Sequence, residues 1–483
     1  MKNHSAKILL QNQLIKFAEK VMIFISNSLL YQIWCKLRYI THNVERQLIE
    51  LEDIKMANSD FVIQYGTLSK YTGLDTEITI PEDVKIIGPN AFRDNINIVS
   101  VTIPEGVMSI GGLAFCGCTS LESIVIPKTV SKISMDTFAN CVSLKNITVP
   151  EGVTEIGNSA FAGCKSLTSI VIPKSVSRIG KNCFDGCVSL ESIVLFDGLR
   201  AIGEFAFSEC EKLKSLTFPA TLEKIDKSMF WLCNNLESVT IPEGVKEIGK
   251  SAFRRCVKLK KIDIPKSVNI IREDAFAECE NLTSVNVLQE DVKIERYAFW
   301  FCEKLKKISL SHNAEVEERV FGGCKALADE NGFVVVENKL YDYVGESQDV
   351  IVPENVTHVD ECALCATGLK SVIFSEGVVE IGEKAFSESK KLSKVILPST
   401  LREIKKDAFC ECSRLTKVVI PEGLIKIGDF AFLSCNRLKK ISLPKSLTEI
   451  SHTAMPDNIT IAAPAGSYAE QYAKEHNIPF VAE

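Results

Sequence analysis

A period of 23 residues constrains this chain more than any other feature of its sequence. From Pro81 onward, successive segments follow the pattern P-x-x-V-x-x-I-G-x-x-A-F-x-x-C-x-x-L-x-x-I-x-I. Because one such segment, here called a rung, is too small to bury its own apolar side chains, each rung must cover those of its neighbours. The phenylalanine column indicates about 16 rungs and comprises Phe92, Phe115, Phe138, Phe161, Phe184, Phe207, Phe230, Phe253, Phe276, Phe299, Phe321, Phe386, Phe409 and Phe432, with Leu364 and Met455 as weaker members.

The pattern within a rung predicts its local structure. Leu167, Ile170 and Ile172 alternate with polar residues and are followed by proline, which is typical of a short strand with one buried face. The segment A-F-x-x-C-x-x-L has apolar spacings of three and four, which favour a short helical turn. The sequence therefore predicts an α+β repeat solenoid with a parallel β-sheet face, short helical turns and a cap at each end.

Columns of identical residues should form the core of this stack. We expect a structural ladder in which phenylalanines contact phenylalanines and small buried thiols follow thiols. Twelve of the 18 cysteines share one column, and Asn95, Thr367 and Ser389 replace cysteine there in other rungs. The ladder residues most central to this prediction are Phe115, Phe138, Phe161, Phe184, Phe207, Phe253, Cys141, Cys164 and Cys187.

The rung at 150–172, P-E-G-V-T-E-I-G-N-S-A-F-A-G-C-K-S-L-T-S-I-V-I, resembles the BspA-like leucine-rich repeat of bacterial surface proteins. The resemblance extends over most of the chain. It implies a curved or twisted solenoid without a cofactor, and attachment to host or matrix proteins in the secreted members.

Two segments break the period with the same internal spacing. Residues 61–81 and 333–353 each look like a β-hairpin that feeds a first rung, with Tyr71 and Tyr343 in equivalent places. We interpret them as starting modules of two arrays; the alternative is that 331–352 is an insertion inside one solenoid. The predicted divisions are 1–55, a non-repeat helical extension; 56–80, a starting hairpin; 81–330, a first array; 331–352, a second hairpin; 353–457, a second array; and 458–483, a C-terminal capping module.

The two ends of the chain depart from the repeat. At the C-terminus we expect a strand over 459–462, then a helix opened by the capping box Ser467-x-x-Glu470 and running to about His476. At the N-terminus, the apolar run from Val21 to Cys35 is too short and too polar to span a bilayer, and it is a poor signal peptide. One hypothesis is that translation starts at Met56; the other is that residues 1–55 form a helix that contacts a membrane or a partner.

Neither charge nor motifs indicate catalysis. A formal net charge of −6 provides no basic surface for nucleic acid. The sequence contains no triad, HExxH, P-loop or dinucleotide fingerprint, so we expect no enzyme, cofactor or small-molecule substrate. Cys362 and Cys365 form a lone CxxC, which is weak as a metal or redox motif. Many unpaired thiols favour a reducing, cytoplasmic compartment; the alternative is the cell surface or secretion.

A binding surface is the remaining function that the sequence indicates. Just after the column phenylalanine most rungs carry small or polar residues, but two rungs carry tryptophan and a rung between them carries two arginines, the types enriched at binding hot spots. We predict a non-enzymatic protein-binding chain, adhesin-like or host-interacting, with an intracellular structural scaffold as the alternative. The predicted partner-binding ridge consists of Trp231, Leu232, Arg254, Arg255, Trp300 and Phe301.

Overall fold

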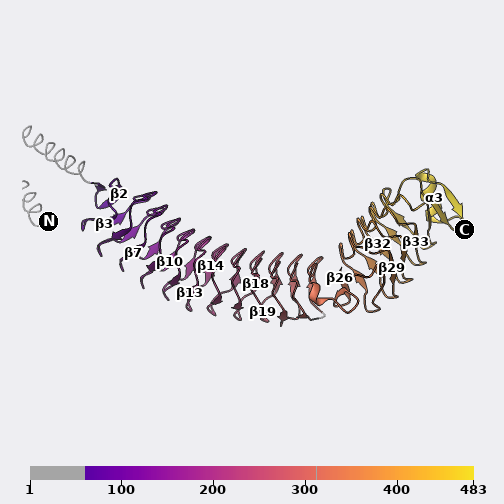
Figure 1. Cartoon of the computed structure of the whole chain (residues 1–483), viewed down its shortest axis with the longest axis horizontal. Helices are drawn as coiled ribbons and strands as arrows, with labels where there is room; N and C mark the ends of the chain where they lie inside the picture. The colour runs from indigo at the N-terminus through magenta and orange to yellow at the C-terminus, as the bar shows by residue number, and fades with distance from the viewer. Residues whose placement is uncertain (1–59, 312) are drawn as a thin grey trace, which may run out of the picture. The chain divides into compact units, whose positions relative to one another are not determined.

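The computed structural model describes residues 60–311 and 313–483 (Figure 1). Two compact units divide the chain: one contains Met1–Tyr65 and Lys70–Gly73, and the other contains Gly66–Ser69 and Leu74–Glu483. The predictions about residues 1–55 and about a start at Met56 lie outside the described residues.

The described part of the first unit contains strand β1 (Phe61–Gln64) and the end of strand β2 (Thr67–Tyr71). The rings of Phe61 and Tyr71 lie 4.9 Å apart at an interplanar angle of 46°. This aromatic pair has a counterpart in the second hairpin, described below.

Each rung of the second unit contributes one longer strand to a parallel ladder. Equivalent residues pair across neighbouring rungs, as Ile170 does with Ile193, and in strands such as these two the central residue is buried while its neighbours are exposed. The strands are β3 (Glu77–Thr79), β5 (Ser100–Thr102), β7 (Ser123–Val125), β9 (Asn146–Thr148), β11 (Ser169–Val171), β13 (Ser192–Val194), β15 (Ser215–Thr217), β17 (Ser238–Thr240), β19 (Lys261–Ile264), β21 (Ser284–Val287), β23 (Lys307–Ser309), β27 (Asp349–Val352), β29 (Ser371–Phe374), β31 (Lys394–Ile396), β33 (Lys417–Val419), β35 (Lys440–Ser442), β37 (Thr460–Ala463) and β38 (Phe480–Ala482).

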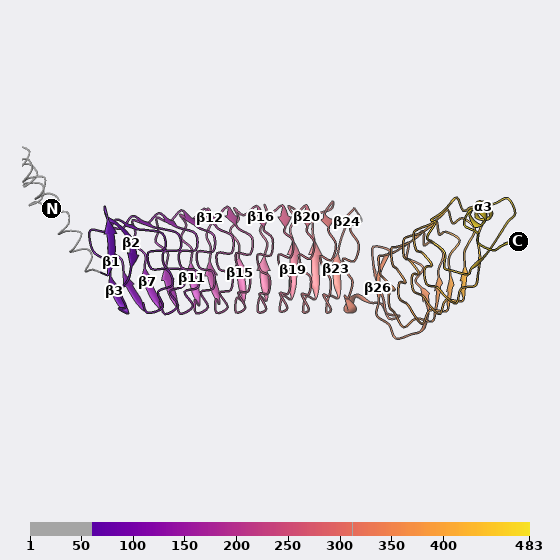
Figure 2. The ribbon, with the colours of Figure 1, turned by 90° about the horizontal axis from the view of Figure 1, so that it is seen from above.

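A second parallel ladder is formed by the residue pairs that end just before the repeat glycine. Figure 2 shows the two sets of strands as separate rows, with β12, β16, β20 and β24 in one and β11, β15, β19 and β23 in the other. The two-residue strands of this ladder are β4 (Ile86–Ile87), β6 (Ser109–Ile110), β8 (Lys132–Ile133), β10 (Glu155–Ile156), β12 (Arg178–Ile179), β14 (Ala201–Ile202), β16 (Lys224–Ile225), β18 (Glu247–Ile248), β20 (Ile270–Ile271), β22 (Lys293–Ile294), β24 (Glu315–Val316), β28 (His358–Val359), β30 (Glu380–Ile381), β32 (Glu403–Ile404), β34 (Lys426–Ile427) and β36 (Glu449–Ile450).

The rung count predicted from the phenylalanine column was too low. The structure is a parallel-strand solenoid of about 18 turns, whereas the column gave about 16. The difference arises at the C-terminus, where β37 and β38 continue the longer-strand ladder beyond β35. These last turns carry no column phenylalanine, so a count based on that residue misses them.

The predicted short helical turns were also wrong. In the rung that contains Phe184, the N–H groups of Asn182, Phe184 and Gly186 donate to carbonyl oxygens of the next rung. Only the intervening N–H groups close local turns, as from Asp185 to Asn182. Asn182 and Gly186 have φ values of 54° and 69°, a left-handed conformation that interrupts a right-handed helix. The same spacing of three and four thus arises from alternating turns that pair with the next rung.

The phenylalanine and cysteine columns run through the buried core of the stack. The column phenylalanines from Phe92 to Phe321 are buried, and the rings of neighbouring rungs stack at centroid distances between 4.8 and 5.8 Å. Cys141, Cys164 and Cys187 are fully buried, and each thiol donates a hydrogen bond to the carbonyl oxygen of a phenylalanine 26 residues earlier. Both columns therefore link neighbouring rungs.

A break in both ladders separates the rungs before and after residue 330. The longer-strand sheet ends at β23 and the shorter one at β24, and new sheets begin at β27 and at the hairpin of β25 (Phe333–Val336) and β26 (Lys339–Tyr343). Phe333 and Tyr343 lie 5.1 Å apart at 50°, close to the geometry of Phe61 and Tyr71. The last rung before the break includes a single 3-10 turn, η1 (Lys325–Leu327). Whether these hairpins start two arrays stays a proposal.

Contacts nevertheless cross this break. The backbone N–H of Arg319 donates to the buried carboxylate of Asp360 over 2.6 Å, and Arg296 forms an ion pair with Glu361 at 2.5 Å. The rings of Phe321 and Tyr341 meet edge to face, with their centroids 5.0 Å apart. The column of stacked rings therefore ends on a tyrosine of the hairpin.

The predicted C-terminal helix is confirmed. Helix α3 (Tyr468–Glu475) follows Ser467, whose side chain accepts a hydrogen bond from the N–H of Glu470. The Glu470 carboxylate accepts a hydrogen bond from the backbone N–H of Gly466. A capping box would use the N–H of Ser467, one residue later. Buried Ala469, Tyr472 and Ala473 belong to the same apolar core as the preceding rungs. That this segment serves as a cap of the solenoid stays a proposal.

Candidate partner-binding surfaces

Trp300 and Phe301 form an aromatic corner immediately after the buried Phe299. Their rings meet edge to face at 4.4 Å, and Tyr297 contacts Trp300 in the same way at 5.9 Å. The next rung carries Gly322 and Gly323 at the equivalent positions, where the two rings pack. Trp300 is thus half-buried, whereas Phe301 keeps 38% of its surface exposed.

Arg254 and Arg255 are held in place by one carboxylate of the next rung. Arg254 Nη2 lies 2.6 Å from Oε1 of Glu278, and Arg255 Nε lies 2.6 Å from Oε2 of the same side chain. Partial burial raises the pKa of Glu278, but the hydrogen bonds and charges of the two arginines lower it on balance. Glu278 therefore stays ionised and fixes both guanidinium groups at the surface.

The predicted ridge is brought together only in part. Arg254, Arg255, Trp300 and Phe301 line one pocket of about 350 Å³, together with Glu278, Glu280 and Glu303. Trp231 and Leu232 occupy the same columns three rungs before Trp300, are half-buried and do not line this pocket. Four of the six residues of the predicted ridge therefore line this pocket. The pocket also contains three glutamates that the sequence analysis did not predict.

The face of the longer strands carries a second recess. A groove of about 760 Å³ lies over β7, β9 and β11 and is lined by exposed Val125, Thr148, Ser169 and Val171. Val125 and Val171 are 70% and 55% exposed, which is high for large apolar side chains. Its lining also includes the charged residues Glu105, Lys128 and Glu151.

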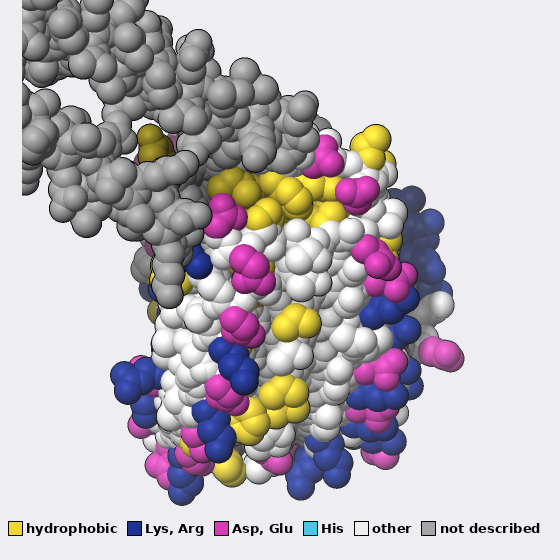
Figure 3. Space-filling view, turned by 90° about the vertical axis from the view of Figure 1, so that its left-hand side faces the viewer, with side chains coloured by type: hydrophobic (Ala, Val, Ile, Leu, Met, Phe, Trp, Pro, Cys, Tyr) yellow, Lys and Arg dark blue, Asp and Glu magenta, His cyan; other side chains and the backbone are white. Residues whose placement is uncertain are grey.

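Charged side chains of both signs cover other parts of the surface. In the end-on view of Figure 3, dark blue and magenta groups alternate in bands, with white surface and scattered apolar groups between them. This interleaving gives no extended field of one sign on the visible face.

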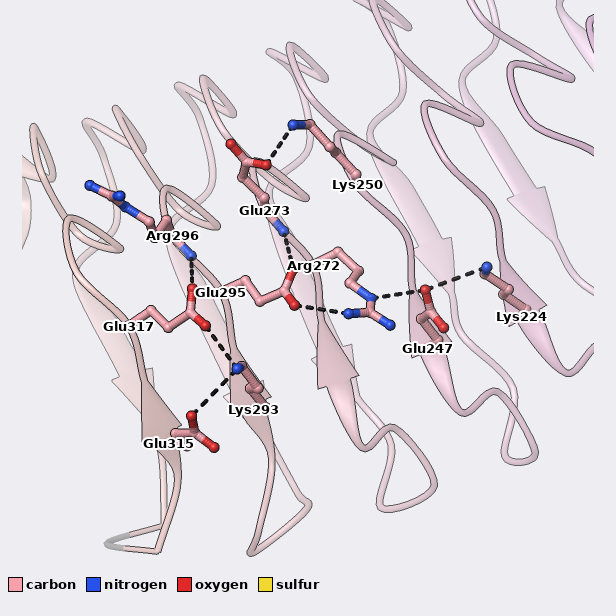
Figure 4. A network of polar contacts seen from close by, with 10 residues as sticks. All are labelled: Lys224, Glu247, Lys250, Arg272, Glu273, Lys293, Glu295, Arg296, Glu315 and Glu317. Carbon is pink, nitrogen blue, oxygen red and sulfur yellow. Dashed lines mark hydrogen bonds and ion pairs between the residues drawn. The ribbon is translucent and has the colours of Figure 1, made fainter.

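An ion-pair ladder runs beside strands β16 to β24 (Figure 4). Glu247 contacts Lys224 at 3.4 Å and Arg272 at 3.0 Å, and Arg272 contacts Glu295 at 2.9 Å. Farther along, Lys293 lies 2.9 Å from Glu317. The ladder connects successive rungs by side chains, in parallel with the backbone pairing.

The family model for the BspA type leucine rich repeat region, built from six copies, matches residues 70–191, 155–262, 224–331 and 334–461. These matches cover more than half of the chain. The chain belongs to the BspA-type leucine-rich repeat family.

Solved structures of bacterial leucine-rich repeat proteins resemble this BspA-type chain. A leucine-rich repeat protein from Bacteroides ovatus is 29% identical, and the match covers 81% of this chain and 100% of that one, with a TM-score of 0.54. A leucine rich cell surface protein from Faecalibacterium prausnitzii is 26% identical over 86% of this chain and 94% of that one, with a TM-score of 0.33. No protein in the search of curated proteins matches the chain.

The family membership indicates a repeat scaffold and no catalytic family. Within residues 60–311 and 313–483, no group of three or more His, Cys, Asp or Glu side chains is arranged to hold a metal ion. The same described residues contain no helix long and apolar enough to cross a membrane.

Two features of this BspA-type chain were not predicted from its sequence. Arg272, Glu295 and Glu317 replace the repeat glycine that follows the short strand, and these replacements form much of the ion-pair ladder. The cysteine column was predicted as a ladder of small buried thiols, and the hydrogen bonds that these thiols donate were not predicted. Its substitutes asparagine, threonine and serine are all hydrogen-bond donors, a signal that could have revealed this role.

Proposed function

We propose that this chain is a non-enzymatic protein-binding solenoid that contacts its partner through the pocket bordered by Arg254, Arg255, Trp300 and Phe301. The observation that carries the proposal is the combination of a partly exposed aromatic corner with two arginines already fixed by Glu278. Such groups lose little side-chain freedom on binding, and tryptophan and arginine dominate binding hot spots. Family membership supports a protein partner in general terms.

Two settings fit this activity. In the first, the chain is adhesin-like and contacts host or matrix proteins; in the second, it is an intracellular scaffold. Protease treatment of intact cells separates them, because only a surface-exposed chain is degraded before lysis. The thiols favour the second setting. Every cysteine that the structure describes is unpaired, and all but three of them are buried.

The test compares binding by wild-type protein with two variants. Partners captured from host extracellular protein and from native lysate are identified, and the affinity of each purified partner is then measured. Trp300→Ala combined with Phe301→Ala should weaken binding at least about tenfold, because a hot spot contributes about 2 kcal/mol or more. The matched control, Val171→Thr on the longer-strand face, should bind as wild type does. Unchanged affinity in the aromatic variant together with a loss in the Val171 variant would place the partner on the strand face instead.

A further inference from the structure

Cys362 and Cys365 stand apart from the other described cysteines. Column thiols such as Cys187 are fully buried, and burial raises the pKa of that thiol to about 12, which keeps it protonated and unreactive. Cys362 and Cys365 are half-buried, outside the column, and their thiols form a hydrogen bond with each other. They occur in the first rung after the break in the ladders, the only rung with cysteine at both of these positions.

The backbone of this rung holds the two cysteines at the ends of one turn. The N–H of Cys365 donates to the carbonyl oxygen of Cys362 over 3.0 Å, with the buried Leu364 between them. A hydrogen-bonded four-residue turn brings its terminal Cα atoms within about 7 Å. A disulfide typically joins Cα atoms about 4.4 to 6.8 Å apart. The turn that every rung uses to pair with its neighbour is therefore compatible with a disulfide at this place.

The charges around the pair favour a thiolate on Cys365. The hydrogen bond from Cys362 and the positive charge of Arg319 together lower the pKa of Cys365 to about 7, against partial burial and the carboxylates of Asp342 and Glu388, which raise it. The same hydrogen bond raises the pKa of Cys362, because the two thiols compete for one negative charge. Arg319 is itself held in place: its guanidinium lies over the ring of Tyr297, and its backbone N–H donates a hydrogen bond to the carboxylate of Asp360.

We propose that Cys362 and Cys365 are a redox-active dithiol, which a small disulfide such as glutathione disulfide converts reversibly into an intramolecular disulfide. The Cys365 thiolate attacks one sulfur of glutathione disulfide, whose S–S bond breaks and releases one glutathione thiolate. Cys362 then attacks the Cys365 sulfur and releases the second. The two cysteines lose two electrons and two protons, which the two glutathione molecules take up as thiols.

Oxidation at this site would act on the contacts that cross the break. It closes the turn covalently and removes the negative charge of the thiolate near Arg319. Arg319 lies in the rung before the break, and its backbone N–H donates a hydrogen bond to Asp360 on the other side. The site is independent of the pocket proposed for partner binding, so either proposal can fail without the other.

The experiment equilibrates the full chain in glutathione buffers of increasing oxidised fraction, quenches with acid and maps free and bonded cysteines by alkylation and mass spectrometry. We expect a bond between Cys362 and Cys365 that forms reversibly in the native protein, while half-buried Cys410 gains no intramolecular bond. Cys362→Ser should trap a mixed disulfide between glutathione and Cys365, and Cys410→Ser should behave as wild type. The proposal is overturned if both thiols stay alkylatable in fully oxidised glutathione, if Cys365 pairs with another cysteine, or if Cys362→Ser traps no glutathione.

Discussion

The thiol of Cys187 donates a hydrogen bond of 3.2 Å to the carbonyl oxygen of Phe161 in the preceding rung. That oxygen also accepts the N–H of Cys164 within its own rung, again at 3.2 Å. The same arrangement recurs along the cysteine column, so each column carbonyl closes a local turn and binds the next rung. Ser389 reproduces it in the second series of rungs, where its hydroxyl donates to Leu364 over 2.9 Å.

Ser389 offers a direct test of this role. Ser389→Ala should lower the free energy of unfolding by about 1 kcal/mol, because it removes a buried hydrogen bond. Ser389→Cys should cost less, because the thiol can donate in the same direction and cysteine is the usual residue of this column. Chemical denaturation measures both. If alanine were tolerated better than cysteine, packing alone would explain the column.

The stacked phenylalanines should dominate the stability of the solenoid. Phe207 is fully buried between Phe184 and Phe230, with ring centroids 5.6 and 5.4 Å away. Phe207→Ala should cost about 3 to 5 kcal/mol, because it leaves a cavity with packed neighbours on two rungs. The exposed Lys212 is the control, and its replacement by alanine should change the free energy of unfolding by no more than about 0.5 kcal/mol. Comparable effects at the two positions would contradict the stacked core.

The lowered pKa of Glu247 predicts how the stability of the ion-pair ladder depends on pH. Partial burial raises its pKa, but the hydrogen bond from Arg272 and the charges of Lys224 and Arg272 lower it on balance. A carboxyl with a lowered folded-state pKa stabilises the fold above its unfolded pKa of about 4.3, and this contribution is lost as the pH falls through the folded-state value. Glu247→Gln should therefore lose up to about 1 kcal/mol at neutral pH and low salt, and nearly nothing below about pH 3.

Urea denaturation at both pH values measures the effect. Added salt at about 1 M should reduce the difference at neutral pH, because it screens exposed charges. Glu243 is exposed and forms no ion pair with any residue that the structure describes, so Glu243→Gln serves as the control. A deficit in Glu247→Gln that persists unchanged in acid would indicate a packing defect rather than a lost ion pair.

The repeat determined most of the fold because its core positions are shared by every rung. Burial of the phenylalanine, cysteine and strand columns could be predicted from the period, since each position has only its own column to pack against. The conformation of the turns around Phe184 could not be predicted from the sequence, because helical turns and alternating left-handed turns produce the same apolar spacing. Only the hydrogen bonds to the next rung distinguish them.

The candidate sites were harder to predict because they are departures from the repeat. The aromatic pair at Trp300 and Phe301 was visible as an anomaly in the sequence, but its packing depends on Gly322 and Gly323, which look like ordinary small residues. The CxxC motif was interpreted as weak for lack of other ligands. Its environment depends on Arg319, more than 40 residues away in the sequence, which no local pattern connects to it.

The reactivity of Cys365 should follow the charge of Arg319. Alkylation requires the thiolate, so its rate in the native protein should rise with pH and reach half its maximum near the pKa of about 7. Arg319→Gln removes a positive charge and should shift this midpoint upward by roughly one pH unit, while Arg319→Lys should keep it near the wild-type value. The rate is measured by mass spectrometry of the peptide that carries Cys365, with buried Cys187 as an internal standard that stays unmodified. A midpoint that is the same in all three proteins would show that the hydrogen bond from Cys362 alone activates the thiol.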